Sequence, residues 1–161
     1  MMHGTGRCQT GLSLVELVIG LVLVTVLAAS AALRWQSTGE NTVGYQIDLL
    51  ARDLRHVQGL AATQGRTLRF NVESTRYCVT AAPDSACAKA ITDPATGKPF
   101  VVPVQHGVTL SGASTEFDSL GRPKDVGGLL AAARTFGLTA ETTMWSAVLR
   151  PLTGFVEVKS P

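Results

Sequence analysis

The sequence predicts an α+β protein in which one long N-terminal helix, membrane-embedded in its first half and amphipathic in its second, packs on an antiparallel β-rich head. Three observations carry this prediction. The chain begins with a long apolar run, continues with apolar residues at helical spacing, and changes to a period of two after Gly65. A helix followed by a series of short strands is typical of α+β folds. At 161 residues, the chain has room for one such domain.

The apolar run covers residues 12–33 and stops at Arg34. A helix of this length can cross a hydrocarbon core of roughly 30 Å at about 1.5 Å per residue. We therefore expect residues 12–34 to form a transmembrane helix, preceded by a short basic leader at residues 1–11. The only formally charged residue inside the run is Glu16, close to its start.

The helix is expected to continue beyond the apolar run, because no proline occurs between Met1 and Ala82. Residues 35–65 then form its amphipathic continuation, with a pliable middle at Gly39 and Gly44 and a stop at Gly65. One face of the helix is predicted to be buried and carries Ile47, Leu50, Leu54, Val57 and Ala61. The opposite, polar side is predicted to carry Asp48, Arg52, Asp53, Arg55 and Gln58.

Residues 66–161 are expected to form the β-rich head. Leu68, Phe70 and Val72 alternate with Thr67, Arg69, Asn71 and Glu73, which predicts a half-buried strand. A second strand is expected at residues 76–80. Further strands are expected at residues 100–102, 108–110, 115–117, 134–138, 144–150 and 155–158. Residues 82–99 and the Gly127 and Gly128 pair are predicted loops, and residues 129–133 fit either a helical turn or a strand.

The feature that bears most on function is the start of the apolar run, where Gly11 and Leu12 precede Glu16. A carboxylate inside a membrane helix costs about 2.5–3.5 kcal/mol on insertion scales, so it is rarely present without a use. If the chain is cleaved after Gly11, the new α-amine of Leu12 lies one helical turn from Glu16. The two charges can then compensate each other within one subunit or between neighbours, which would set the axial register of packed helices.

These residues resemble the type IV pilins and pseudopilins. That family has a short basic leader ending in glycine, a hydrophobic first residue and glutamate as the fifth, and Gly11, Leu12 and Glu16 stand at those positions. Phenylalanine is more common than leucine at the first position. The resemblance implies cleavage after Gly11 by a prepilin peptidase and N-methylation of Leu12. It also implies a bacterial inner-membrane protein with one span and its head in the periplasm, incorporated into a filament.

Three further segments are similar to the GspH/FimT branch of that family. They are residues 50–61 with the strand after them, residues 117–123 with their glycine turn, and the Thr153 and Gly154 pair before the last strand. The branch implies a minor pilin or pseudopilin that helps to initiate or cap a type IV pilus or a type II secretion pseudopilus. The implied partners are other minor subunits, the major subunit, the peptidase and the inner membrane.

Two alternatives without a pilin role stay open. An ordinary secretory signal could be cleaved in the small residues 28–31, although the apolar run is longer than the roughly 7–15 residues of a signal-peptide core. The chain could also be a single-pass periplasmic protein that joins no filament. Glu16 and the glycine just before the run favour the pilin-like interpretation over both.

The cysteine count predicts one disulfide. Of Cys8, Cys78 and Cys87, the first lies in the expected leader. We expect the other two to be bonded in a periplasmic setting, where thiols are oxidised. A metal site is less favoured, because no nearby histidine or third cysteine completes a ligand set.

A loose basic set raises the alternative of DNA contact, as in some FimT-like minor pilins. Its members are Arg52, Arg55, Arg66, Arg69 and Arg76. Interleaved acids favour a salt-bridged surface instead. The net charge of +2 is too small to imply a polyanionic partner. In place of the basic tail motif of DNA-binding members, the chain has residues 154–157, which end in Glu157. No catalytic or cofactor-binding motif stands out, so we expect neither an enzyme nor a cofactor.

Overall fold

The computed structural model describes residues 14–105, 107–125 and 127–161, without the side chains of residues 30–41. Contacts divide the chain into two units, Met1–Thr38 and Gly39–Pro161. A single helix, α1 (Leu14–Gln64), has residues in both. The boundary falls at Gly39, one of the two glycines that predicted a pliable middle. The expected leader, residues 1–11, lies outside the described residues.

The membrane prediction gains no support from the described part of the chain. Among the residues that the structure describes, no helix has the length and hydropathy expected of a membrane span. The transmembrane segment at residues 12–34 stays a prediction.

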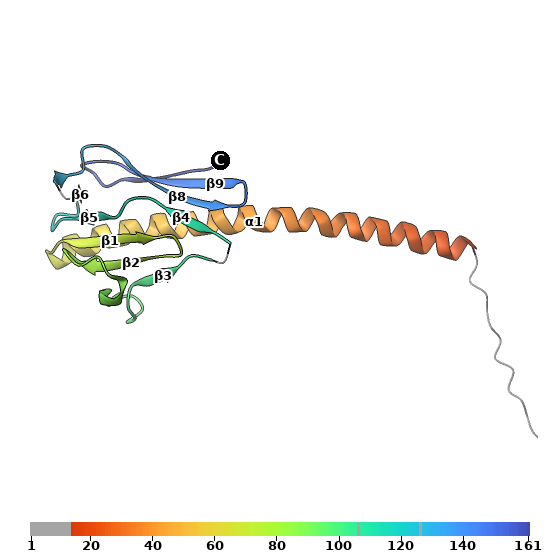
Figure 1. The fold of residues 1–161 in the computed structure, drawn as a ribbon, viewed down its shortest axis with the longest axis horizontal. Helices are drawn as coiled ribbons and strands as arrows, with labels where there is room; N and C mark the ends of the chain where they lie inside the picture. The colour runs from red at the N-terminus through yellow and green to blue at the C-terminus, as the bar shows by residue number, and fades with distance from the viewer. Residues whose placement is uncertain (1–13, 106, 126) are drawn as a thin grey trace, which may run out of the picture. The chain divides into compact units, whose positions relative to one another are not determined.

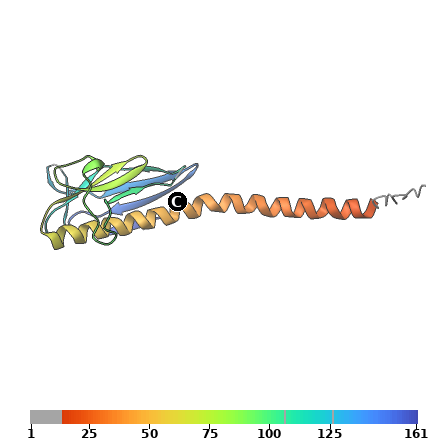
Figure 2. The ribbon, with the colours of Figure 1, turned by 90° about the horizontal axis from the view of Figure 1, so that it is seen from below.

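The second half of α1 buries the predicted face. Ile47, Leu50, Leu54, Val57 and Ala61 are all fully buried. This stretch, yellow in Figure 2, runs along one side of both sheets. The helix therefore supplies one wall of the hydrophobic core in the second unit, as its spacing predicted.

Gly65 ends the helix, also as predicted. Its φ is +62°, a conformation that costs glycine little because it has no Cβ. The Gly65 N–H donates to the Ala62 carbonyl at 3.4 Å, and the Arg66 N–H donates to the Ala61 carbonyl at 3.3 Å. This pair of bonds is the Schellman arrangement, which satisfies carbonyls that the last helical turn leaves without partners.

Two antiparallel sheets make up the rest of the second unit. The six-stranded sheet has the order β3 (Val101–Pro103), β2 (Arg76–Ala81), β1 (Leu68–Glu73), β5 (Thr115–Phe117), β6 (Pro123–Asp125) and β7 (Gly128–Leu129). The four-stranded sheet has the order β10 (Val156–Lys159), β9 (Thr143–Leu149), β8 (Arg134–Ala140) and β4 (Thr109–Ser111). A short 3-10 helix, η1 (Cys87–Lys89), interrupts the loop after β2. The predicted α+β class is confirmed (Figure 1).

One short strand was not predicted, and a second overlaps only at Leu129 with the range that fitted a helical turn or a strand. Strand β6 begins at Pro123, and β7 begins at Gly128 in what the sequence indicated as a loop. Proline and glycine are poor strand formers, so local sequence argues against both. Pairing overrides it: Lys124 of β6 lies opposite Glu116 of β5, and opposite charges across a strand pair are stabilising.

Aromatic rings join the two sheets inside the core. Phe70 of β1 stacks on Tyr77 of β2, with ring centroids 5.1 Å apart. It also meets Phe136 of β8 edge-on, with centroids 5.9 Å apart. Because Phe136 belongs to the other sheet, this contact links the two layers. Phe70, Phe136 and Phe117 are all fully buried.

Two polar residues are buried, although the sequence pattern placed them on exposed, polar sides of the helix and of the first strand. Asn71 is 3% exposed and Asp53 is 8% exposed. Asn71 donates from Nδ2 to Thr80 Oγ1 at 2.9 Å. Asp53 Oδ2 accepts the Tyr77 hydroxyl at 2.7 Å. Each is buried because a partner on β2 compensates it, and buried polar groups are tolerated when they are hydrogen-bonded.

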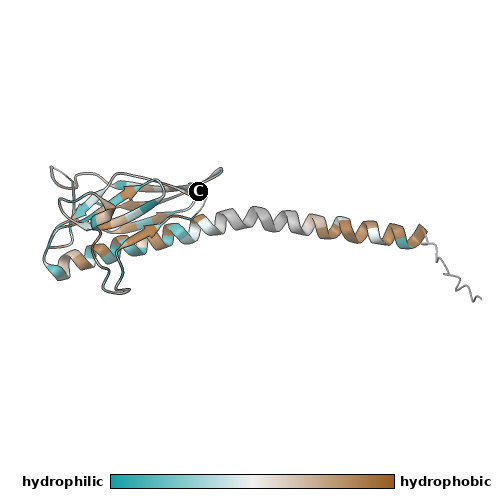
Figure 3. Cartoon of the chain, turned by 60° about the horizontal axis from the view of Figure 1, so that its bottom comes forward, coloured by the Kyte–Doolittle hydropathy of each residue, from teal (hydrophilic) through white to brown (hydrophobic). Residues whose placement is uncertain are grey.

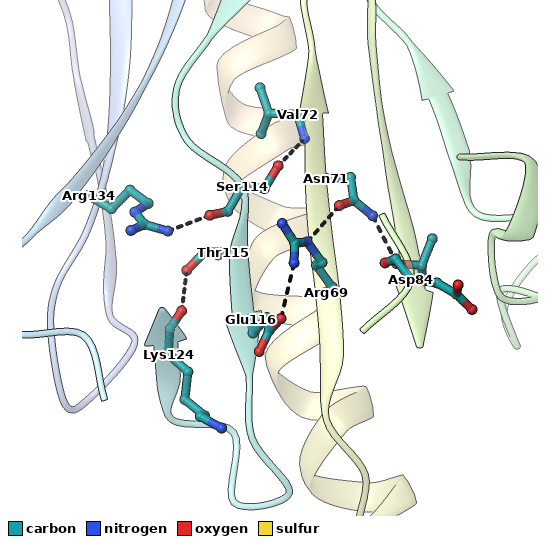
Figure 4. Close-up of polar contacts among 10 residues, drawn as sticks. Arg69, Asn71, Val72, Asp84, Ser114, Thr115, Glu116, Lys124 and Arg134 are labelled. Carbon is teal, nitrogen blue, oxygen red and sulfur yellow. Dashed lines mark hydrogen bonds and ion pairs between the residues drawn. The ribbon is translucent and has the colours of Figure 1, made fainter. Parts of the chain in front are cut away.

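A polar network continues outward from Asn71 (Figure 4). The Arg69 guanidinium donates to Asn71 Oδ1 at 3.0 Å and lies 3.3 Å from Glu116 Oε1. The Ser114 hydroxyl accepts the Val72 N–H at 3.1 Å, and the Ser114 carbonyl accepts a bond from Arg134 of β8. This network therefore ties β1 and β5 to the second sheet by polar contacts.

Candidate assembly surface

The first half of α1 presents apolar side chains on all sides. Every large apolar side chain from Leu14 to Leu27 is between 50% and 80% exposed, and most of the ribbon in this stretch is brown in Figure 3. Soluble monomers rarely expose apolar patches beyond a few hundred Å², and larger ones mark protein or membrane contacts. An exposed apolar stretch of this kind is typical of a protein or membrane contact.

Glu16 is the polar exception on this surface. It lies in the first turn of α1, where the helix dipole favours a negative charge. It is exposed, and no group among the described residues is bonded to its carboxylate. The Thr25 hydroxyl, by contrast, donates to the Val22 carbonyl within the helix at 2.8 Å. Glu16 is thus an exposed carboxylate within an otherwise apolar described stretch. Gly11 and Leu12 lie outside the described residues.

The cysteine prediction is confirmed in the structure, where Cys78 of β2 and Cys87 of η1 form a disulfide with their Cα atoms 5.6 Å apart. The bond fixes the start of the loop that follows β2. Cys8, assigned to the leader, lies outside the described residues.

The five arginines of the basic set each have a hydrogen-bond or ion-pair partner within the second unit. Arg55 donates to the Val156 carbonyl at 2.8 Å, and Arg76 lies 2.7 Å from Glu73. The same holds for the remaining three, whose partners are Asp53 for Arg52, Gln64 for Arg66, and Glu116 with Asn71 for Arg69. Each acceptor differs, so the set does not converge on one ligand.

A groove that sequence reasoning missed lies beside the second half of α1. Its helical wall carries Leu49, Arg52, Asp53 and His56, and its other wall is the chain from Asp93 to β3. The steps of three, four and seven between the helical residues place them on one face. That spacing was readable as a second stripe next to the buried one. The opposite wall comes from a distant loop, which no local pattern predicts.

Two carboxylates in this groove have shifted pKa values. Burial raises the pKa of Asp53, while the hydrogen bond from Tyr77 and the charge of Arg52 oppose the rise. The pKa of Asp93 is lowered, first by the Ala95 N–H bond and then by bonds from Thr96 and His56, against the effect of burial. Desolvation and the charge of Asp53 raise the pKa of Tyr77, so its hydroxyl remains a donor at neutral pH.

The glycine turn after β5 is built as its sequence suggested. Asp118 Oδ1 accepts the N–H groups of Leu120 at 2.9 Å and Arg122 at 2.8 Å. Gly121 has a φ of +76°. Burial alone would raise the pKa of Asp118, but the bonds from Arg122 and Leu120 outweigh it and lower the pKa.

The arrangement defines a class of protein: a long α-helix whose second half packs on two antiparallel sheets. Among solved structures, the chain is similar to the minor pseudopilin EpsH from the type 2 secretion system of Vibrio cholerae. EpsH aligns with a TM-score of 0.56 over 74% of this chain and 97% of its own, at 11% identity. The type IV minor pilin FimU of Pseudomonas aeruginosa aligns with a TM-score of 0.50 over 75% of this chain and 89% of its own, at 13% identity. No protein-family model and no curated protein matches the sequence. The chain has a type IV pilin-like fold.

Proposed function

We propose that this chain is a minor pilin or pseudopilin, a structural subunit that helps to initiate or cap a type IV pilus or a type II secretion pseudopilus. A prepilin peptidase removes residues 1–11, Leu12 becomes the methylated N-terminus, and residues 12–34 anchor the subunit in the inner membrane with its head in the periplasm. Its partners are other minor subunits and the major subunit.

One observation carries this proposal. Within one helix, the apolar side chains from Leu14 to Leu27 are exposed together with Glu16, while the second unit closes a core of its own. The second unit buries its own apolar side chains, whereas the first half of the helix leaves its apolar side chains exposed. This combination suits a subunit whose helix packs among the helices of other subunits. In that setting, the carboxylate meets a terminal amine in low dielectric, where an ion pair is strong.

The mature N-terminus is the first test. Mass spectrometry of the protein from its native membrane is expected to show methylated Leu12 and the whole apolar helix. Replacing Gly11 with a bulky residue should leave the precursor in the membrane. A soluble form that begins near residue 31 or 32 would instead assign the segment to an ordinary cleaved signal.

Substitutions of Glu16 test the assembly of the subunit independently of its membrane anchoring. Glu16→Ala and Glu16→Gln should still reside in the membrane and be cleaved, because neither change removes apolar surface or Gly11. Both should fail to co-purify with partner subunits, since breaking a buried charge pair costs about 3–5 kcal/mol. Glu141→Gln, which removes an exposed carboxylate from the head, is the matched control and should assemble. Normal assembly of both Glu16 variants would refute the charge-pairing role.

DNA binding is the less supported alternative, because four of the five arginines are hydrogen-bonded to separate acceptors in the second unit. Retention of duplex DNA by the full chain, weakening steeply with salt, would revive it. An absence of such retention would leave the structural role as the proposal.

A further inference from the structure

A groove lies beside α1, and the proposed filament role does not use it. It encloses about 720 Å³, within the range of binding clefts. Phe100 lines it and is 6% exposed. Leu49, Val101 and Val102 line it and are half-buried, so an apolar surface is available inside it.

Hydrogen bonds and a ring contact connect the two walls of the groove and order its loop wall. His56 of α1 lies 3.4 Å from Asp93 Oδ1 and meets the Phe100 ring edge-on. Asp93 in turn accepts the Ala95 N–H at 3.0 Å and the Thr96 hydroxyl at 2.9 Å. The disulfide at Cys87 fixes the start of the same loop. The wall is therefore preformed, and an occupant does not have to order it on binding.

The charged side chains of the groove differ in exposure: its carboxylates are largely buried, and its cations are exposed. The side chains of Asp53 and Asp93 are each only 11% exposed, whereas that of Arg52 is 75% exposed. Lys98 is exposed, and its ammonium has no bonding partner among the described residues. Asp48, one helical turn before Arg52, does not line the groove. The exposed formal charges at the mouth are therefore those of Arg52 and Lys98, while the carboxylates of Asp53 and Asp93 are largely buried.

Addition of a strand to β3 does not explain the groove, although β3 is the edge of its sheet. Phe100 and Val104 bond to the β2 side, so Val101 and Pro103 face outward. The Val101 N–H donates to the Pro99 carbonyl at 2.8 Å, and proline has no N–H. The edge thus lacks donors for an added strand, and recognition falls to the side chains.

We propose that this groove binds an acidic protein segment that carries at least one apolar side chain. Carboxylates of the segment pair with Arg52 and Lys98, and its apolar side chain covers Leu49 and Val102. Nucleic acid fits less well, because two exposed cations beside two buried carboxylates offer few phosphate contacts. That the segment belongs to a neighbouring subunit rests on the proposed function; the charge and shape of the groove do not.

Two labelled peptides test the groove on the purified full chain in non-ionic detergent. One alternates valine with aspartate, and its matched control alternates valine with asparagine. Fluorescence anisotropy is expected to show binding of the acidic peptide that weakens with salt, and binding of the asparagine peptide that is weaker by about tenfold or more. Arg52→Glu combined with Lys98→Glu should abolish the difference. Lys159→Glu, which reverses an exposed cation of β10, should preserve it.

Three results would overturn the proposal. Equal binding of the two peptides, or no binding of either, would show that the groove does not recognise carboxylates. A DNA duplex that binds in place of the acidic peptide, and is lost with the same variants, would assign the groove to nucleic acid. Self-association of the chain that disappears in the double variant would assign it to a second copy. Glu16→Gln should bind the acidic peptide normally, so failure of the filament role and failure of the groove remain distinguishable.

Discussion

In the first half of α1 the apolar side chains lie on every side of the helix and are exposed, whereas in the second half they lie on one side and are buried. Leu21 is 60% exposed, and Leu54 is fully buried. Both are leucines in one continuous helix, so helix propensity does not distinguish them. What differs is the neighbourhood: the second half packs on two sheets of its own chain.

This difference separates two uses of apolar surface. Burial of apolar surface contributes roughly 25 cal/mol per Å² whichever molecule it is buried against. Apolar surface buried against the same chain stabilises the fold, whereas apolar surface buried against another molecule stabilises an assembly. Changes in the second unit should therefore alter its free energy of unfolding. Changes between Leu14 and Leu27 should alter assembly and leave that free energy unchanged.

The largest expected effect comes from a pair of leucine truncations. Leu54→Ala should destabilise the second unit by about 2–5 kcal/mol, because it leaves a cavity in a closed core. Leu21→Ala should leave unfolding of that unit unchanged and weaken co-purification with partner subunits. Urea unfolding in detergent, followed by circular dichroism, measures the first quantity. Equal destabilisation by both variants would break the contrast between the two halves.

The disulfide offers the next largest effect. Replacing Cys78 and Cys87 together by alanine should cost about 2–3 kcal/mol, because the unfolded chain loses a constraint on a short loop. Cys8→Ala is the matched control and should change nothing, since Cys8 belongs to the expected leader. Two freely alkylatable thiols in unreduced native protein would contradict the bond itself.

The sequence predicted those elements whose evidence is local. The buried face from Ile47 to Ala61, the stop at Gly65 and most strands follow from spacing and turn residues. Asp53 was placed wrongly, because its burial depends on a hydroxyl 24 positions further along the chain. Strand β6 was missed for a similar reason, since pairing with β5 outweighs a poor strand sequence.

At the candidate site, Glu16 could be identified from the sequence because a lone carboxylate in an apolar run is energetically costly. The groove could not, because its walls are distant in sequence.

The Asp53 and Tyr77 pair tests the head at one buried contact. Tyr77→Phe should cost about 1–3 kcal/mol at neutral pH, because the Asp53 carboxylate loses its hydrogen-bond donor. Tyr45→Phe is the matched control and should have no effect, because Tyr45 is 64% exposed. The test is urea unfolding of both variants at neutral pH.

The same pair carries a pH dependence with a definite sign. The pKa of Asp53 is raised in the folded state, so its contribution to stability is full below the unfolded value near 3.8 and is lost as the pH rises through the folded value. Removing the donor raises the folded pKa further. The cost of Tyr77→Phe should therefore shrink as the pH falls from neutrality through that raised pKa. A cost independent of pH would show that Asp53 is not ionised beside Tyr77.

The smallest expected effect is a gain in stability at the tip of the β8–β9 hairpin. Ala140 pairs with Thr143, which leaves a loop of Glu141 and Thr142. Glu141 has a φ of +51°, a left-handed conformation that asparagine tolerates better than glutamate. Glu141→Asn should therefore stabilise the second unit by about 0.5–1 kcal/mol. Thr142→Asn, at a position without positive φ, should not stabilise it.

The gain in stability from Glu141→Asn should appear in global unfolding, because Phe136 and Leu149 bury the two strands in the common core. A gain confined to hydrogen exchange at the hairpin tip would show that the hairpin opens separately from the core. The second unit would then not unfold as one body, and the contrast with the first half of α1 would hold only for the residues packed directly on the helix.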